Sequence, residues 1–489
     1  MNESESEYDS NSEYETDSEF EFEFESETES EYETDSEYEY ETYSELSGIT
    51  SSELSDDDDE SIYHLEQTNT EDDLLELEVS VYENIDWYIN EFAINYSNPN
   101  FHEQIVNDIT QLIIIGGIET GLFDDLEDSN DSIRNFVEKR ITNYFDTGIA
   151  PLRSYPIDYI QPKSSQEDQE KITQQLTHLL ELPVQIQRTP EWYATRYRLL
   201  TASNIYKIFG SQCLYNSFIL EKCKPLLVPI PNETECHSVN TESPMHHGVR
   251  FEPLSQRIYE ILYSPNQPIS EFGCIQHPEY SCIGASPDGI NMDEASNHYG
   301  NMIEIKNIFN REITGIPSEA YWTQVQLQLE VCKLPMCDFV ETRFKQYENE
   351  NAFWMEDPEN LEGGVGRSFR GVILYFVHKT ALGSTPYYVY RIVDSDSYYK
   401  IKHKKYTEDW INEQKTILNE YSLYETIYWY LDEISVIMIP RNKLWFSSAI
   451  PAILDTWKVI EYERVSGYSH RLPRKTNKIK QPICVIKLE

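Results

Sequence analysis

The stretch that decides the fold is GASPDGI at residues 284–290, followed by NMIEIKNI at residues 301–308. The first run is short and apolar, and it ends in a turn, because Asp-Gly is a strong turn dipeptide and Pro287 fixes the backbone before Asp288. The second run alternates between apolar and polar residues, which is typical of a strand with one buried face. A turn followed by such a strand is expected to bring the acid of the turn beside the acid of the strand.

Two carboxylates and a lysine converge in this arrangement. Glu304 and Lys306 lie two residues apart and therefore share one face of the strand. The carboxylates of Asp288 and Glu304 need a cation, because like charges at close range would otherwise raise the pKa of one of them. Mg²⁺ suits such a site, since it takes hard oxygen ligands and draws few of them from protein. The backbone carbonyl of Ile305 offers a further ligand, and Lys306 would orient the attacking water or stabilise the developing charge. The pattern therefore predicts metal-assisted phosphodiester hydrolysis.

Each of these residues, taken alone, has an ordinary structural interpretation. A solvated strand face often reads Glu-x-Lys, and an aspartate in a Ser-Pro-Asp-Gly sequence is often only a turn residue. It is the order and spacing of Asp288, Glu304 and Lys306 together that favour a catalytic site.

Three further segments extend the pattern, and they are RTPEWYATRYRLLTAS at 188–203, GVRFEPLSQRIYE at 248–260 and YWTQVQLQLEV at 321–331. With the two central segments, they resemble the PD-(D/E)xK nuclease superfamily, and within it the YqaJ-like viral recombinase family, a relative of phage lambda exonuclease. The resemblance covers about residues 185–345. It implies an α/β restriction-endonuclease-like core, in which helices flank a mixed central sheet.

The resemblance also assigns roles to individual residues. It implies that the catalytic residues are Glu252, Asp288, Glu304 and Lys306, and that Glu252, Asp288, Glu304 and the Ile305 carbonyl hold the metal. One or two Mg²⁺ ions are implied, with Mn²⁺ as an admissible substitute.

The same resemblance implies a pocket for a DNA 5′-phosphate. Its residues would be Arg196, Ser203, Ser286 and one of the two glutamines Gln324 and Gln326. Arginine suits this role because its planar guanidinium offers several donors to phosphate oxygens, and hydroxyl and amide groups complete the cage.

The glutamine segment poses a conflict between its pattern and the family resemblance. Its apolar residues alternate with period two from Val325 to Val331, which by itself predicts a strand. The family places this segment on a helix, where residues two apart point about 200° from each other, so that only one of Gln324 and Gln326 can face the site. We follow the family and expect a helix.

Other assigned residues have alternative interpretations. Arg196 could be a solvated helix residue, and Trp192 suits packing better than insertion into DNA. Ser203 could be a helix N-cap, which is compatible with binding an anion. Glu252 could be an acid in a first helical turn that the helix dipole favours. The histidine pair at 246–247 lacks partners at the spacing of a zinc site.

Charge is distributed very unevenly along the 489 residues. The formal net charge is −49, but residues 1–133 hold 43 of the 87 acidic side chains and no lysine or arginine. The remaining residues carry 44 acidic and all 38 basic side chains, a formal charge of only −6. The acidity therefore belongs to one end, and the rest is compatible with DNA binding.

We divide the chain into five parts from composition and periodicity. These are a disordered acidic Ser/Glu/Tyr-rich tail at 1–65, a small helical module at 70–150, a linker at 151–175, the nuclease core at 176–400 and a helical extension with a basic end at 401–489. The tail could mimic DNA, recruit a basic partner or simply aid solubility. The basic segments at 400–405 and 471–480 could contact the DNA backbone or only solubilise the surface.

These observations predict a Mg²⁺-dependent deoxyribonuclease that digests duplex DNA from its ends, as a 5′→3′ exonuclease of viral recombination or repair. The implied partners are double-stranded DNA ends, a single-strand annealing protein and further copies of the chain. The alternatives are an endonuclease of the same superfamily and a catalytically silent DNA-end-binding or virion protein.

The eight cysteines are scattered without a Cys-x-x-Cys pair, which indicates free thiols in a reducing compartment. The sequence has no apolar run long enough to span a membrane and no secretory signal pattern at its start. A soluble intracellular protein is therefore expected, in host cytoplasm or in the virion if the source is viral.

Overall fold

The computed structural model describes residues 70–123, 130–159, 166–183, 189–226, 240–356, 369–380, 386–393 and 404–472. All of them belong to one compact unit, Asp57–Glu489. The predicted acidic tail at 1–65 lies outside these residues, as do most of the basic segments at 400–405 and 471–480.

The first described elements are helical. They are α2 (Glu71–Glu91), the 3₁₀ helix η2 (Ala93–Ser97), α3 (Phe101–Thr120) and α4 (Asn130–Asp146). Helix α2 starts at a capping box, in which Thr70 and Asp73 bond reciprocally to each other's backbone N–H groups. Its buried face carries Leu77, Val81, Ile85, Tyr88 and Ile89, spaced at three or four residues, and these pack in one core with apolar side chains of α3 and α4.

The described parts of the predicted linker, residues 151–159 and 166–175, contact the rest of the fold. Strand β1 (Tyr155–Pro156) pairs with the far end of β10 (Tyr421–Pro440), and helix α5 (Gln166–Glu181) follows. The Arg153 guanidinium donates hydrogen bonds to the carbonyl oxygens of Tyr96, Ser97 and Pro317. This segment therefore ties η2 to the loop that precedes α9 (Glu319–Cys332).

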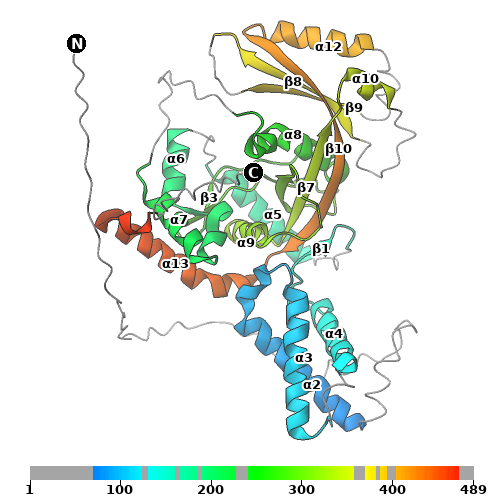
Figure 1. The fold of residues 1–489 in the computed structure, drawn as a ribbon, viewed down its shortest axis with the longest axis vertical. Coiled ribbons are helices and arrows are strands. Elements are labelled where there is room, and N and C mark those ends of the chain that lie inside the picture. The colour runs from blue at the N-terminus through cyan, green and yellow to red at the C-terminus, as the bar shows by residue number, and fades with distance from the viewer. Residues whose placement is uncertain are drawn as a thin grey trace, which may run out of the picture. The chain divides into compact units, whose positions relative to one another are not determined.

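The described strands form two sheets. The larger sheet runs in the order β5 (Gly289–Ile290), β6 (Met302–Asn307), β7 (Met336–Gln346), β10, β8 (Arg370–His378) and β9 (Tyr387–Val393), with β1 beside β10. Only β6 and β7 pair in parallel; the other pairs in this sheet are antiparallel. The smaller sheet contains β2 (Leu200–Thr201), β4 (Ile283–Ala285) and β3 (Ile275–Gln276). The predicted α/β fold, a mixed sheet flanked by helices, is confirmed (Figure 1).

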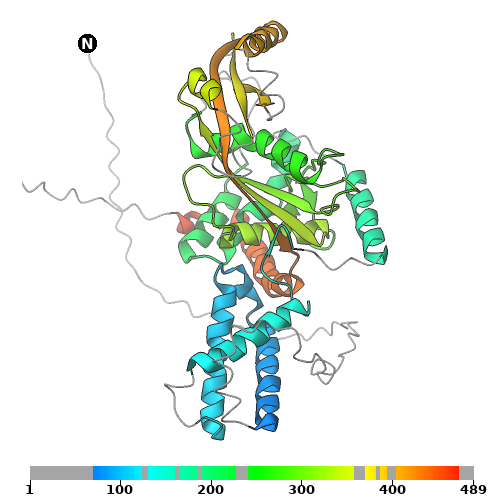
Figure 2. The same ribbon diagram turned by 90° about the vertical axis from the view of Figure 1, so that its right-hand side faces the viewer.

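Strand β10 corrects the prediction that residues 401–489 form a helical extension. It is 20 residues long and lies inside the sheet, where its first half pairs with β8 and its second half with β7 (Figure 2). Two irregularities, between Leu423 and Glu425 and between Leu431 and Glu433, shift its register. Each such bulge inverts the alternation of side chains, so no continuous period-two pattern marks this strand in the sequence. The sheet therefore extends beyond the predicted limit of the core at residue 400.

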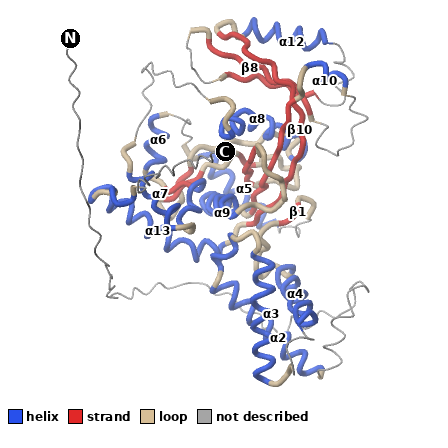
Figure 3. The backbone as a smooth tube through the Cα atoms, in the orientation of Figure 1, coloured by secondary structure: helices blue, strands red, loops and turns tan. Residues whose placement is uncertain are grey.

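Helices surround the two sheets (Figure 3). The remaining ones are α6 (Pro190–Tyr197), η3 (Ala202–Ile208), α7 (Gln212–Cys223), α8 (Pro244–Tyr263), α10 (Glu350–Met355), α12 (Lys404–Ile417), α13 (Lys443–Ser466) and η6 (Ser469–Arg471). Helix α8 packs Phe251, Leu254 and Ile258 against side chains of β7, β8 and β10. Helix α9 is buried along nearly its whole length. Among the residues that the structure describes, no helix combines the length and apolar character needed to cross a membrane.

Candidate active site

The turn after β4 places Asp288 beside β6, the strand that carries Glu304 and Lys306. Strand β5 begins directly after Asp288 and pairs with β6, with Gly289 opposite Ile303. A Cβ at position 289 would lie 2.8 Å from the side chain of Ile269, so glycine allows this close approach. As a result, the Asp288 carboxylate reaches across to β6 and accepts a hydrogen bond of 2.7 Å from the backbone N–H of Ile305.

Three donors converge on the carboxylate of Glu304, which is buried at the centre of the site. Lys306 Nζ lies 2.5 Å from Glu304 Oε1, as expected for residues two apart on a strand. From α9, Gln324 Nε2 donates to the same oxygen at 2.5 Å, and Gln328 Nε2 donates to Glu304 Oε2 at 2.7 Å. Both carboxylate oxygens are therefore held in a fixed orientation.

The charges of the site perturb one another. Burial raises the pKa of Asp288 well above its usual range, and the neighbouring charge of Glu304 raises it further. Burial alone would lower the pKa of Lys306, but the attraction of Glu304 and Asp288 outweighs it and raises that pKa. Lys306 is thus a permanent cation at neutral pH, suited to stabilise negative charge rather than to accept a proton.

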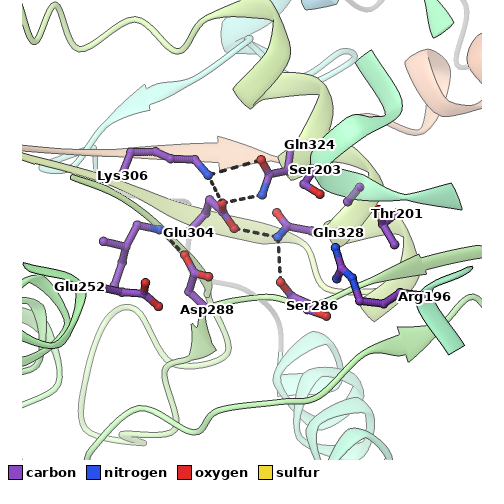
Figure 4. Close-up of a pocket in the computed structure, with 12 residues that line it drawn as sticks. Arg196, Thr201, Ser203, Glu252, Ser286, Asp288, Glu304, Lys306, Gln324 and Gln328 are labelled. Carbon is purple, nitrogen blue, oxygen red and sulfur yellow. Dashed lines mark hydrogen bonds and ion pairs between the residues drawn. The ribbon is translucent and has the colours of Figure 1, made fainter. Parts of the chain in front are cut away.

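These residues line a cavity of about 270 Å³. Its lining contains nearly all the predicted site residues, namely Arg196, Ser203, Glu252, Ser286, Asp288, Glu304, Ile305, Lys306 and Gln324, together with Thr201, Ala202 and Gln328. Figure 4 shows Lys306 and Glu252 at one end, Arg196 and Thr201 at the other, and Glu304 between them. The cavity therefore has a carboxylate-and-lysine end and an arginine-and-hydroxyl end.

Gln326 is the exception, and its predicted role in phosphate binding does not fit its position. Its amide is buried on the opposite side of α9, where Nε2 donates to Pro440 O at 2.8 Å and Oε1 accepts from Asn442 N at 2.7 Å. On a helix, residues four apart share a face and residues two apart do not. Gln328, four residues after Gln324, therefore takes the place beside the site. Applying the helical period to the predicted helix would have identified it.

The arginine end is built by α6 and η3. Thr189 caps α6 and Pro190 opens it, both of which favour a helix start. The Arg196 guanidinium lies 4.7 Å from the centre of the Trp192 ring, so Trp192 supports this arginine from the same helix. Ser203 belongs to η3, which follows β2 directly. Gln328 of α9 also lines this cavity, and its Oε1 is buried without a hydrogen-bond partner among the described residues.

Helix α8 brings Glu252 to the cavity. The helix begins at Pro244 after the N-cap Ser243, so Glu252 lies more than two turns inside it rather than in the first turn. One turn further, Ser255 Oγ lies 2.6 Å from Asn307 Oδ1 and 2.8 Å from Thr342 Oγ1. This cluster fixes α8 against β6 and β7 next to Glu304 and Lys306.

The donor set determines which metal the cavity suits. Within the described ranges, no group of three or more His, Cys, Asp or Glu side chains is placed to hold a metal ion by itself. The oxygen donors that line the cavity are Asp288, Glu304 and Glu252, with Ile305 between them. A small set of hard oxygen donors fits Mg²⁺, which completes its shell with water and phosphate.

Comparison with known proteins agrees with the predicted resemblance. Residues 191–335 match the model of the YqaJ-like viral recombinase domain. An uncharacterized protein of Acanthamoeba polyphaga mimivirus is 26% identical over an alignment of 359 residues, which covers 68% of this chain. The chain spans 62% of the length of that relative.

Two solved structures of the alkaline exonuclease LHK-Exo from Laribacter hongkongensis, one in complex with dAMP, are also similar to this chain. Each is 17% identical and covers 56% of this chain and 94% of the exonuclease chain, with a TM-score of 0.30.

Proposed function

We propose that this protein is a Mg²⁺-dependent deoxyribonuclease, and that it digests duplex DNA from 5′-phosphorylated ends in the 5′→3′ direction. One observation carries the proposal: a single cavity contains Asp288, Glu304 and Lys306 at one end and Arg196 at the other. The match of residues 191–335 to a viral recombinase domain supports the same chemistry. The similarity to proteins named as an alkaline exonuclease is compatible with it.

In this proposal, different residues of the cavity bind the DNA end and hydrolyse the phosphodiester bond. At one end, Arg196 binds the terminal phosphate through its planar donors, with Ser203 and Ser286 as further polar partners. At the other end, the scissile phosphodiester lies against Asp288 and Glu304. Lys306 keeps its proton and stabilises the negative charge that develops on the phosphorus oxygens.

Asp288, Glu304 and the carbonyl of Ile305 would hold Mg²⁺, with Glu252 acting through water. When bound, the ion supplies an activated water and neutralises charge on the phosphate. Gln324 and Gln328 orient Glu304 toward that position through their hydrogen bonds to its two oxygens. Without a cation, Asp288 and Glu304 repel each other, which is the physical reason for metal dependence.

The biological context follows from the relatives. A viral relative and the recombinase domain favour a role in viral DNA recombination, in which 5′→3′ digestion leaves 3′ single strands for an annealing protein. Further copies of the chain would enclose the duplex and allow repeated cleavage.

Digestion of linear duplex DNA with Mg²⁺ tests the proposal, with 5′-phosphate and 5′-hydroxyl ends compared and Lys306→Ala measured alongside. We expect faster digestion of phosphorylated ends and loss of cleavage in the variant. Cleavage of closed circular DNA without end preference would replace the exonuclease by an endonuclease. No cleavage with either Mg²⁺ or Mn²⁺ would refute the proposed function.

A further inference from the structure

Helix α13 lies outside the segment that matches the recombinase domain, yet it contacts α6, the helix that carries Arg196. Its residue Arg464 donates from Nη2 to the carbonyl oxygen of Tyr197 at 2.8 Å, and Tyr197 is the last residue of α6. The same guanidinium donates to the carbonyl oxygen of Lys222 on α7 at 2.8 and 3.0 Å. It also lies 4.1 Å from the centre of the Tyr197 ring. Arg464 therefore joins three helices at the point where α6 ends.

Lys222 continues this connection from α7. Its buried Nζ donates to the carbonyl oxygen of Leu199 at 2.7 Å and to that of Arg196 at 3.2 Å. A lysine charge is seldom buried without strong compensation, because desolvation is costly, and here burial lowers the pKa of Lys222 to about 8. Its position at the carbonyl-rich end of a helix is electrostatically favourable.

Together the two cations hold the backbone of residues 196–199. Three of the four carbonyl oxygens in this segment, those of Arg196, Tyr197 and Leu199, accept hydrogen bonds from Lys222 or Arg464. A backbone fixed in this way determines where the Arg196 side chain begins. Trp192 then limits where that side chain can go.

The opposite end of α13 is fixed to the glutamine helix. Asn442 caps α13 by accepting from Trp445 N at 2.8 Å, and its own N–H donates to Gln326 Oε1 on α9. Helix α9 also carries Gln324 and Gln328, the partners of Glu304. Helix α13 therefore connects the helix that orients the metal-binding carboxylate with the helix that carries the phosphate-binding arginine (Figure 1).

We infer that Arg464 and Lys222 are positioning residues for 5′-phosphate recognition, and that α13 acts as a brace that sets Arg196 at a fixed place relative to Glu304. The inference rests on the proposed function, because it assigns the selectivity of that same cavity to residues that never touch DNA. An exonuclease of this kind distinguishes a phosphorylated end only if the arginine stands at the correct distance from the scissile bond. If α6 were held less rigidly, the cavity would accept both 5′-phosphorylated and 5′-hydroxyl DNA ends.

Arg464→Met tests this, with Arg471→Met as the matched control. Arg471 also joins the end of α13 to α7, through Glu463 and Asn216, but the structure gives it no contact with α6. Each variant is compared with the unmodified protein for kcat/KM on 5′-phosphorylated and 5′-hydroxyl duplexes and for binding of both duplexes by fluorescence anisotropy. Thermal unfolding of each variant sets a common temperature at which both are folded.

We expect Arg464→Met to lower the preference for phosphorylated ends about tenfold, the effect of one charged hydrogen bond. The loss should appear mainly in KM and in binding, and Arg464→Lys should recover part of it because its charge still reaches one carbonyl. Arg471→Met should keep the preference within about twofold, since the contacts it loses, with Glu463 and Asn216, join α13 to α7 and do not involve α6.

Two results would overturn the inference. One is an unchanged phosphate preference in Arg464→Met at a temperature where it is folded. The other is an equal loss of preference in both variants, which would indicate general loosening of the C-terminal helix. Absence of cleavage by the unmodified protein would instead refute the nuclease proposal, while the binding measurement would still decide the role of Arg464.

Discussion

Gln326 and Gln328 provide an internal comparison, because they are identical residues on opposite faces of one buried helix. Each is about 1% exposed and each donates its amide to an acceptor of another element. Gln328 donates to the carboxylate of Glu304, whereas Gln326 exchanges hydrogen bonds with the backbone at Pro440 and Asn442. Replacing each by leucine, which has a similar volume, removes the polar contacts and leaves the packing largely filled.

The two substitutions should act on different quantities. A hydrogen bond to a charged group contributes about 1.5–3 kcal/mol, so losing the donor to Glu304 should reduce kcat/KM about 10- to 100-fold in Gln328→Leu. Glu304 keeps its contacts with Lys306 and Gln324, so the loss should be partial. Gln326→Leu leaves a buried carbonyl and a buried N–H unpaired, at a cost of about 1–3 kcal/mol each in the free energy of unfolding, with activity per folded molecule nearly unchanged.

Initial rates on 5′-phosphorylated duplex DNA and urea unfolding of the same preparations separate these effects. Gln328→Leu should lose mainly activity, whereas Gln326→Leu should lose mainly stability. Equal activity losses in both, or a larger loss in Gln326→Leu, would refute the assignment of the two faces of α9. Such a result would support the prediction from the sequence that Gln326 belongs to the phosphate pocket.

Three further outcomes are expected. Asp288→Asn should abolish cleavage. In EDTA it should also raise the free energy of unfolding by about 1–2 kcal/mol, because it removes a buried charge that Glu304 repels. A lower stability of this variant would contradict the repulsion between Asp288 and Glu304. Glu330→Gln should destabilise the protein by about 3 kcal/mol, since the buried Glu330 carboxylate holds Arg441 through two hydrogen bonds, and chemical unfolding measures this. The pKa of Lys222 is about 8 in the folded protein, below its usual 10.5, so between these pH values the unfolded chain binds a proton that the folded protein does not. The free energy of unfolding should therefore rise with pH in this range, by on the order of 1–3 kcal/mol. Lys222→Met should remove that rise, which thermal melts from about pH 7 to 10 would measure.

The sequence predicted that Asp288, Glu304 and Lys306 converge, because the relevant contacts are local. Asp288 and Lys306 are separated by only 18 positions, and the turn and period-two alternation between them encode their convergence. Helix α9 was harder, because its residues are buried from Trp322 to Cys332. A helix that is buried all round has no polar face, so the period-two run of its apolar residues arises without a strand.

Strand β10 could not be predicted because its pattern depends on partners far along the chain. It pairs with β7 and β8, and the two bulges reverse which residues face each side. Its position between those strands also decides their order in the sheet. Bulges of this kind have no distinctive residue signature here, and only the paired structure reveals them.

Contacts from β7, β10 and α13, which lie after residue 335, support the segment that matches the recombinase domain. The segment that matches the recombinase family ends at residue 335, directly before β7, which is the parallel partner of β6 along its whole length. Without β7 and β10, the strand that carries Glu304 and Lys306 would lie at an open edge, with unpaired N–H and C=O groups on that side. Without α13, Gln326 would lose its partner Asn442, and the carbonyl groups of α6 would lose Arg464. The family segment therefore contains the residues to which we assign the chemistry, while the residues after it complete the sheet and support the cavity that those residues line.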